Sequence, residues 1–225
     1  MRSSYDPITK GSTRFYVPTL FLLYTYAYNE YMEEISQKEI VSTLKRAGIG
    51  VLPTDTLYGV VGSALSKKAV ARIYKVRKRD LKKPLIILIH SISDLALFDI
   101  VLTSKEKKTL AGIWPGKVSV LLSCAHKRFT YLHRGTNMLA FRVPADVVLR
   151  TLLKKTGPLV APSANREGML PAQTIGDALR YFGEHVDFYS DGGKRGGKPS
   201  TLIAFENGVP VIKRIGAVRI KTIMI

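Results

Sequence analysis

The chain has 225 residues, 46% of them hydrophobic, which is long enough for one sizeable core. Its 35 Lys and Arg residues against 17 Asp and Glu give a formal net charge of +18, which favours polyanionic partners, nucleotides and RNA ahead of anionic membranes. The single cysteine, Cys124, excludes an internal disulfide and fits a reducing cytoplasm. The four histidines lack zinc-ligand spacing, which argues against a protein-held zinc site.

The first 31 residues are treated separately because of an apolar stretch, Phe15 to Tyr28, that carries no charge. It is shorter than the roughly 20 residues that a membrane-spanning helix needs. Basic residues precede it, as in a secretory signal peptide, but no small-x-small cleavage site follows. We expect residues 1–31 to be an N-terminal extension, disordered or caused by an incorrect start codon ahead of Met32. Residues 32–225 are then one domain, with no membrane anchor.

From Glu33 the pattern EEISQKEIVSTLKRAG predicts a helix with apolar residues on one side and Gly48 as its stop. Two β-rich runs, GIGVLP and LYGVVG, follow, joined by the polar turn Thr54-Asp55-Thr56. Ser66 is a candidate N-cap for the next helix, KKAVARIYKVRKR, whose apolar face also carries Arg77. A strand, LIILI, comes after Pro84.

The second half of the chain continues to alternate between short strands and helices. VSVLLS, MLAFRV, PLVA, VDFYS, TLIAF and VPVIKR are typical of strands. Helices are predicted at 145–154 and 175–182, the second with a capping box from Thr174 and Asp177. The glycine-rich stretch 191–201 is the most flexible by composition. The pattern predicts an α/β fold in which helices cover a twisted mixed sheet.

Three polar features could carry chemistry. The first is a basic run with a local charge of +8, in which Asp80 is the one acid among nine cations: Lys67, Lys68, Arg72, Lys75, Arg77, Lys78, Arg79, Lys82 and Lys83. Such a run is more often a solvated surface than a site, but Arg77 faces the core side of its helix and guanidinium suits bidentate phosphate contact.

The second feature is PTDTLYG, Pro53 to Gly59, which places two threonine hydroxyls and a carboxylate on a turn after a buried strand. The plain alternative is turn chemistry, with Asp55 bonding nearby backbone amides. The third is APSANREG, in which Ser163 and Asn165 follow a strand and could converge on one ligand or form a local turn.

Together these segments resemble the YrdC family. The motifs run in the family's order over about residues 33–220: Pro53 to Gly59, Arg77-Lys78-Arg79 with Lys83-Pro84-Leu85, Trp114-Pro115-Gly116, Arg142-Val143-Pro144, Pro162 to Asn165, and Ser200-Thr201. Several motifs in one order are more specific than any single one. The resemblance implies a YrdC-type sheet with a concave basic cavity, in a short form without the extra C-terminal domain of longer members.

The resemblance also implies a nucleotidyltransferase reaction, in which L-threonine, bicarbonate and ATP give threonylcarbamoyl-AMP and pyrophosphate for tRNA threonylcarbamoyladenosine modification. ATP would be a substrate, and Mg²⁺ would be held mainly through its phosphates. Expected partners are tRNA or double-stranded RNA and the proteins that transfer the threonylcarbamoyl group to tRNA in the cytoplasm. The alternative is an RNA-binding protein of the YrdC and YciO kind with weak or different activity.

By position in the motifs, the resemblance implies roles for individual residues. Arg77 and Arg79 would be catalytic, and Thr54 and Arg142 would bind threonine. No residue is expected to bind a metal directly. The nucleotide would be bound by Arg77, Arg79, Lys83, Ser119, Ser163, Asn165, Ser200 and Arg214.

Two positions depart from the family pattern. Arg77 stands where the family has lysine, which keeps the charge but changes the donor geometry. A histidine found in the following strand of many longer members corresponds to Leu88 here, with His90 two residues later.

Overall fold

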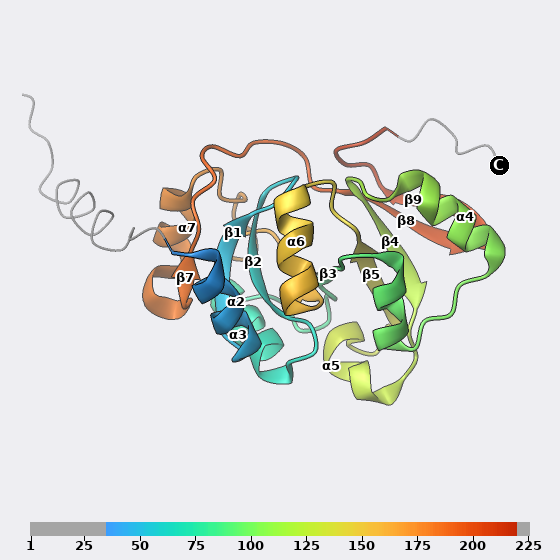
Figure 1. Ribbon diagram of the computed structural model, residues 1–225, viewed down its shortest axis with the longest axis horizontal. Coiled ribbons are helices and arrows are strands. Elements are labelled where there is room, and N and C mark those ends of the chain that lie inside the picture. Colours follow the sequence, from blue (N-terminus) through green and yellow to red (C-terminus); the bar gives the residue numbers. More distant parts are fainter. Residues whose placement is uncertain (1–34, 220–225) are drawn as a thin grey trace, which may run out of the picture. The chain divides into compact units, whose positions relative to one another are not determined.

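The computed structural model describes residues 35–219. The N-terminal extension expected at residues 1–31 lies outside the described residues. Figure 1 shows strands in the middle and helices packed around them. No helix within 35–219 is both long and apolar enough to cross a membrane.

Nine strands of the described chain form one sheet, in the order β7-β1-β2-β6-β3-β5-β4-β8-β9. The pairs β1–β7, β3–β5 and β4–β8 are parallel and the other neighbours are antiparallel, so the predicted mixed sheet is confirmed. The strands are β1 Ile49–Pro53, β2 Tyr58–Ser63, β3 Ile86–Leu88, β4 Val118–Ser123, β5 Met138–Arg142, β6 Leu159–Val160, β7 Phe188–Tyr189, β8 Thr201–Glu206 and β9 Val209–Arg214. Each lies within, or within one residue of, a stretch that the sequence predicts as a strand.

Six α-helices of the described chain accompany the sheet: α2 Gln37–Lys45, α3 Lys67–Arg77, α4 Ser104–Ile113, α5 Thr130–His133, α6 Val147–Thr156 and α7 Ile175–Phe182. Short 3-10 helices lie at Ile92–Phe98, Lys127–Phe129 and Gly183–His185. The Ser66 cap on α3 and the Thr174–Asp177 capping box on α7 are both present, as predicted.

Helix boundaries differ from the prediction where a capping side chain intervenes. Helix α2 begins at Gln37, because Ser36 caps it in a capping box with Glu39, whereas Glu33, where the predicted helix starts, lies outside the described residues. Asp146 likewise caps α6, which begins at Val147. Helix α4 was not predicted, although Thr103 and Glu106 form the same kind of capping box at its start.

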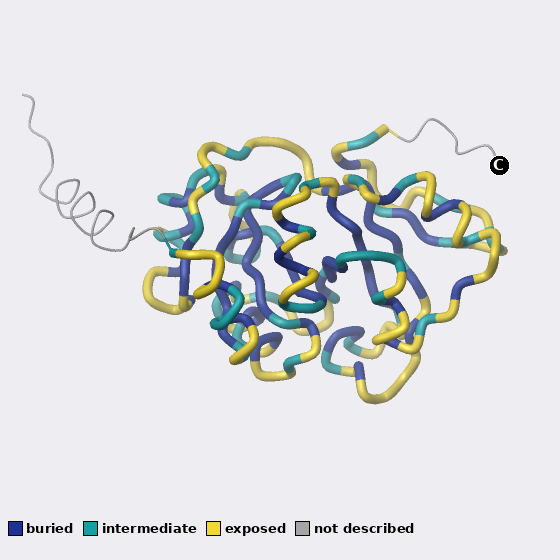
Figure 2. The backbone as a smooth tube through the Cα atoms, viewed as in Figure 1, coloured by how far each residue is buried: buried dark blue, intermediate teal, exposed yellow. Residues whose placement is uncertain are grey.

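One part of the core joins α2 and α6 to the sheet. Its buried members come from both helices and from β1, β2, β3, β6 and β7, and they include Ile40, Leu44, Leu52, Val61, Leu88, Leu149, Leu153 and Leu159. In Figure 1 α6 crosses in front of the strands, and Figure 2 shows buried residues running along those strands. This packing fixes β1, and the polar residue Thr54 of the site follows directly after that strand.

Candidate functional site

A cavity of about 330 Å³ opens where the β1–β2 turn, the end of α3, strands β3 and β5, and the segments before β8 and after β6 meet. Seven of the residues with predicted roles line it: Thr54, Arg77, Arg79, Arg142, Ser163, Ser200 and Arg214. Lys83, Ser119 and Asn165 are not among its lining residues. The fold therefore brings segments up to 160 residues apart in the sequence, from Thr54 to Arg214, to one place.

Four guanidinium groups line this cavity, from Arg77, Arg79, Arg142 and Arg214, and none of its described lining residues is Asp or Glu. Guanidinium stays positively charged at neutral pH and binds carboxylate or phosphate oxygens in a bidentate manner. The cavity is therefore suited to an anionic ligand.

Arg77 is 2% exposed, in agreement with its place on the apolar face of α3. Its Nε donates to the Asn165 backbone carbonyl at 3.0 Å, and one terminal nitrogen donates to Asn165 Oδ1 at 3.0 Å and to Ser163 Oγ at 3.4 Å. The other terminal nitrogen is buried and has no hydrogen-bond partner in the described structure. Burial, reinforced by nearby Arg79, lowers the pKa of Arg77 to about 10, so it remains a cation at neutral pH.

The loop after β6 supports Arg77. Ser163 Oγ donates to Asn165 Oδ1 at 2.7 Å, and the Asn165 side-chain nitrogen donates to the backbone carbonyls of Arg166 and Met169. Asn165 is 7% exposed and lies behind Arg77, whereas Ser163 lines the cavity. The predicted Ser163–Asn165 pair and the basic motif thus form one hydrogen-bonded unit.

Arg79 and Lys83, the other two cations of the motif with predicted roles, have different surroundings from those of Arg77. Arg79 donates to the backbone carbonyls of Lys83 at 3.3 Å and Pro84 at 3.2 Å, which fixes its side chain at the cavity wall. Lys83 is exposed, and its Nζ forms an ion pair with Glu167 at 2.5 Å. Lys67, Lys68 and Lys82 are exposed, as expected for a solvated charge run.

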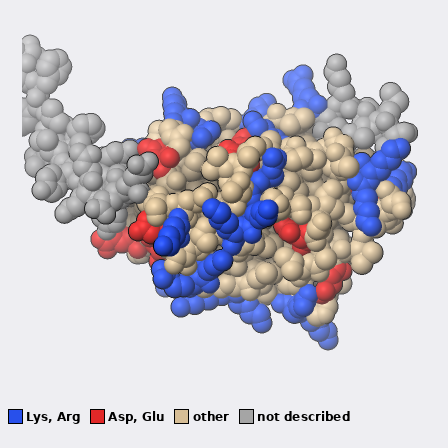
Figure 3. All heavy atoms as spheres, in the orientation of Figure 1, with Lys and Arg blue, Asp and Glu red and all other residues tan. Residues whose placement is uncertain are grey.

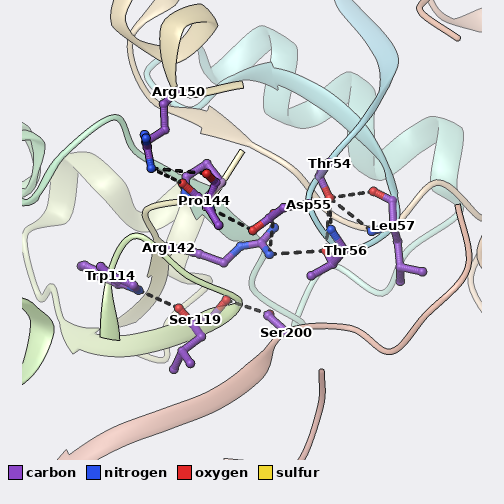
Figure 4. Close-up of polar contacts among 12 residues, drawn as sticks. Thr54, Asp55, Thr56, Leu57, Trp114, Ser119, Arg142, Pro144, Arg150 and Ser200 are labelled. Carbon is purple, nitrogen blue, oxygen red and sulfur yellow. Dashed lines mark hydrogen bonds and ion pairs between the residues drawn. The ribbon is translucent and has the colours of Figure 1, made fainter. Parts of the chain in front are cut away.

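The β1–β2 turn is organised by Thr54, which is 4% exposed. Its hydroxyl donates to the Leu57 carbonyl at 2.7 Å and accepts from the backbone N–H groups of Thr56 and Leu57, both at 3.2 Å (Figure 4). Turn chemistry is therefore present, but it comes from Thr54 and not from Asp55. Most of the hydrogen-bonding capacity of the Thr54 hydroxyl is used inside the turn.

Asp55 pairs instead with Arg142 at the end of β5. The Asp55 carboxylate lies 2.9 Å from the Arg142 guanidinium, with both side chains at most 5% exposed, and it also accepts the Ala145 N–H at 3.1 Å. The same guanidinium nitrogen lies 3.4 Å from the Thr56 hydroxyl (Figure 4). Burial lowers the pKa of Arg142, and the Asp55 carboxylate opposes this shift.

The opposite side of the cavity is built from β4, β8 and β9. Ser119 and Ser200 share a hydrogen bond of 2.8 Å between their hydroxyls, and Ser119 is fully buried. Arg214 donates to the Ser200 carbonyl at 2.8 Å. Ser200 lines the cavity, whereas Ser119 is not among the lining residues and contacts the cavity through its bond to Ser200. The Trp114 indole N–H donates to the carbonyl of Val118, the residue before Ser119 (Figure 4).

Sequence reasoning missed Tyr58, which is fully buried and lines the cavity. Its hydroxyl donates to Asp191 at 2.9 Å or the Gly193 carbonyl at 2.7 Å, and it accepts the Gly192 N–H at 2.9 Å. Burial raises the pKa of Tyr58 to about 12, so the hydroxyl stays protonated as a donor. Tyr58 ties the glycine-rich stretch to the sheet, and its place in PTDTLYG was the available clue.

His90 lies away from the cavity lining. Its Nδ1 is 3.0 Å from the Arg150 carbonyl, and its backbone N–H donates to Asp94. Leu88, in the register of the family histidine, is fully buried in the core. This chain therefore places no histidine side chain among the described residues that line the cavity.

A family model for the Sua5, YciO and YrdC domain, described as telomere recombination, matches residues 42–216. The chain belongs to this family. It shares the fold of a solved Sua5 from Pyrococcus abyssi in complex with L-threonine, with a TM-score of 0.72 and 27% identity, covering 82% of this chain and 56% of that one. It also shares the fold of YciO from Escherichia coli, with a TM-score of 0.73 and 22% identity, covering 83% and 93%.

Curated Sua5/YciO/YrdC relatives carry one consistent name. The threonylcarbamoyl-AMP synthase of Bacillus subtilis is 28% identical over 184 residues, 80% of this chain and 53% of that protein. The threonylcarbamoyl-AMP synthase of Marinobacter nauticus is 30% identical over 169 residues, 74% of this chain and 89% of that protein. The chain thus spans about half the length of some curated relatives and most of the length of others.

Proposed function

We propose that the chain is an L-threonylcarbamoyladenylate synthase, which forms threonylcarbamoyl-AMP and pyrophosphate from L-threonine, bicarbonate and ATP. The observation that carries the proposal is the cavity with four guanidinium groups and no carboxylate among its described lining residues. Its curated relatives bear the name of this activity, and a solved Sua5 relative binds L-threonine. The product would serve tRNA modification through separate transfer proteins.

The reaction needs positioning and charge stabilisation more than a protein nucleophile. The amino group of threonine attacks carbon dioxide derived from bicarbonate, loses a proton and becomes N-carboxythreonine. The new carboxylate oxygen attacks the α-phosphorus of ATP, and the bond to the bridging oxygen of pyrophosphate breaks. Negative charge accumulates on the α-phosphate and on the departing pyrophosphate, where fixed cations lower the barrier.

The cations would be supplied by Arg77 and Arg79. Arg77 is held at three acceptor atoms of the Ser163–Asn165 loop, which limits its reorganisation during reaction. Its free terminal nitrogen could then donate to a phosphate oxygen. Ser163, Ser200 and Arg214 would complete the nucleotide contacts from the lining, with Asn165 and Ser119 bonded behind them. Lys83 would reach phosphate only by leaving Glu167.

Threonine would bind at Arg142 and the β1–β2 turn. The paired Arg142 retains a buried Nε without a hydrogen-bond partner in the described structure, and its guanidinium lines the cavity. A guanidinium edge of this kind matches the carboxylate of an amino acid. The turn hydroxyls of Thr54 and Thr56 stand beside it, so they would determine which side chain is accepted.

Mg²⁺ would need few ligands from the protein in this reaction. The described part of the chain contains no group of three His, Cys, Asp or Glu side chains placed to hold a metal ion, and Asp55 is engaged with Arg142. Mg²⁺ commonly binds nucleotide phosphates and keeps several waters. It would therefore enter with ATP, held by phosphate oxygens.

Pyrophosphate release by the purified protein tests the proposal. The protein is incubated with ATP and bicarbonate, with and without L-threonine, and pyrophosphate is measured. We expect release that depends on threonine. Release that is independent of threonine, or none from a folded protein, would favour the second candidate.

That candidate is a YciO-like protein with weak or different activity. One departure favours keeping it: arginine stands at position 77, where the family resemblance implies lysine. The product assay separates the two candidates without further assumptions.

A further inference from the structure

Lys83 differs from the arginines with predicted roles, because its side chain does not line the cavity. Its Nζ lies 2.5 Å from Glu167 Oε1, and the Lys83 side chain is 55% exposed. The next residue, Pro84, does line the cavity, and so does Arg79, which donates to the Lys83 carbonyl at 3.3 Å. The backbone of Lys83 therefore lies at the rim of the cavity, while its ammonium group is paired with a residue outside the lining.

Glu167 is held in place by contacts with the end of α3 and the loop that follows it. Its backbone N–H donates to the Arg77 carbonyl at 2.8 Å. One carboxylate oxygen accepts the Asp80 N–H at 2.5 Å, and the other pairs with Lys83. One carboxylate thus contacts the loop between α3 and β3 at two points, a backbone group and a cationic side chain.

The carboxylate of Glu167 is charged at neutral pH. The hydrogen bonds from Lys83 and from the Asp80 N–H hold the pKa of Glu167 below its ordinary value of 4.5. An ion pair between side chains that are partly in contact with water is weak. The triphosphate of ATP carries several negative charges against the single charge of the carboxylate, so it could displace Glu167 from Lys83.

The backbone at Lys83 is held independently of the ion pair. The Lys83 carbonyl accepts the Tyr74 hydroxyl at 2.9 Å as well as the Arg79 guanidinium, and the Lys83 N–H donates to the Asp80 carbonyl at 3.1 Å. Tyr74 is 2% exposed, so its ring is a fixed support. The Lys83 side chain can therefore leave Glu167 by rotation about its own bonds, while the loop stays in place.

We propose that Glu167 is a positioning residue that competes with the phosphates of ATP for Lys83. Without ATP, the carboxylate keeps the ammonium group away from the cavity. When ATP binds, the Lys83 side chain turns towards the cavity and joins Arg79 at the phosphates. ATP binding then includes the cost of breaking the ion pair, so Glu167 lowers the affinity for ATP. This role rests on the proposed function, because ATP is the ligand that Lys83 would reach.

The variant Glu167→Gln tests the competition directly. Glutamine keeps a side-chain oxygen that can accept the Asp80 N–H, but it lacks the charge that holds Lys83. Isothermal titration calorimetry of the full chain measures the Kd for ATP and for adenosine, which has no phosphate. We expect the Kd for ATP to fall about twofold to fivefold, the range that the loss of an exposed ion pair allows, and the Kd for adenosine to stay the same.

A matched control separates this competition from a general effect of charge. Figure 3 shows Lys and Arg side chains at many places on one face of the molecule, so loss of any acidic side chain could favour an anionic ligand. Glu206→Gln removes the same charge from another exposed ion pair, with Lys213, and neither residue lines the cavity. We expect the Glu206 variant to bind ATP like the parent.

The variant Lys83→Gln separates competition from a purely structural role. Without the ammonium group, we expect ATP to bind about tenfold more weakly. The double variant Glu167→Gln/Lys83→Gln should match Lys83→Gln, because the carboxylate then has no cation to hold. If Glu167 only stabilised the loop, both single variants would weaken ATP binding. Melting curves for all variants, and the Michaelis constants for ATP and threonine, are measured in parallel, and Glu167→Gln should lower the constant for ATP alone.

Several results would overturn the proposal. These are unchanged or weaker ATP binding in Glu167→Gln, an equal gain in Glu206→Gln or for adenosine, and unchanged ATP binding in Lys83→Gln. The titrations measure binding and not product formation. A parent protein that binds ATP but releases no pyrophosphate with threonine would therefore contradict the proposed function alone, whereas a folded parent that does not bind ATP would overturn both.

Discussion

The carboxylate of Asp55 and the guanidinium of Arg142 form a buried ion pair of 2.9 Å between the β1–β2 turn and the end of β5. Asp55 also accepts the Ala145 N–H, next to the Asp146 cap of α6. One carboxylate therefore holds the turn, the cavity arginine and the start of a helix in a fixed relation.

Asp55→Asn should be strongly destabilising, because it leaves the Arg142 cation buried without its counter-charge. Breaking a buried pair in this way costs about 3–5 kcal/mol. The matched control is Asp99→Asn, whose partner Arg128 is 51% exposed, and it should change stability by about 1 kcal/mol or less. Urea unfolding of both variants measures the difference, and similar losses would contradict the importance of the Asp55–Arg142 pair.

The Arg72–Asp187 pair should make the stability of the fold depend on pH in the acidic range. Burial raises the pKa of Asp187, but the hydrogen bonds from Arg72 and from the Ile49 N–H outweigh it and hold the pKa below its ordinary value of 3.8. A carboxyl with a lower pKa in the folded chain contributes stability above its unfolded pKa, and this is lost as the pH falls through the folded value. Stability should therefore fall below about pH 4.

Asp187→Asn should be less stable than the parent at neutral pH. The difference in stability between the two proteins should become smaller as the solution is acidified. Thermal unfolding at several pH values measures this. Arg72→Gln should produce the same narrowing, and the double variant should be less destabilised than the sum of the two. A gap that stays constant down to pH 2 would show that the Asp187 charge contributes little.

Arg79→Ala should reduce adenylate formation by about tenfold to a hundredfold, since a charge-assisted contact to phosphate is worth about 1.5–3 kcal/mol. Lys68→Ala is the control, because Lys68 is exposed on α3 and should contribute close to nothing. Initial rates at saturating substrate measure both. Equal losses would mean that general positive charge, and not a defined contact, supports the reaction.

Thr54→Val should both destabilise the fold and raise the apparent Michaelis constant for threonine. The hydroxyl bonds three backbone groups of the turn, so its removal leaves buried N–H groups unpaired at about 1–3 kcal/mol. Thr54→Ser keeps the hydroxyl and should retain most of both properties. Threonine and ATP titrations, with a melting curve for each variant, measure this. A defect confined to the ATP titration would assign Thr54 to the nucleotide.

The sequence predicts much of the sheet, because alternating β-rich runs and turn residues are local features. It also places Arg77 in the core, since helical periodicity alone puts that side chain beside Val70 and Ile73. Three-dimensional pairings were not accessible in the same way. The contacts of Asp55 with Arg142 and of Tyr58 with the 191–193 segment join residues 87 and more than 130 positions apart.

The sequence alone also does not show which polar residues line the cavity and which lie behind the lining residues. Ser119, Ser163, Asn165 and Ser200 look equivalent as short polar residues near strand ends. The structure places Ser163 and Ser200 at the cavity and the other two behind them. Lys83 carries the kind of cation that binds phosphate, but it is paired with Glu167 on the surface. The loop that carries Glu167 returns to the end of α3, where Glu167 also accepts the Asp80 N–H.

Mass spectrometry of the nucleotide product, with isotopically labelled bicarbonate, tests the central claim most directly. The purified full-length protein is incubated with ATP, L-threonine and either labelled or unlabelled bicarbonate, and the adenylate fraction is analysed. We predict a threonylcarbamoyl-AMP species whose mass increases by one label and which is absent without threonine. AMP or ADP alone, from protein that is folded and binds ATP, would contradict the assignment.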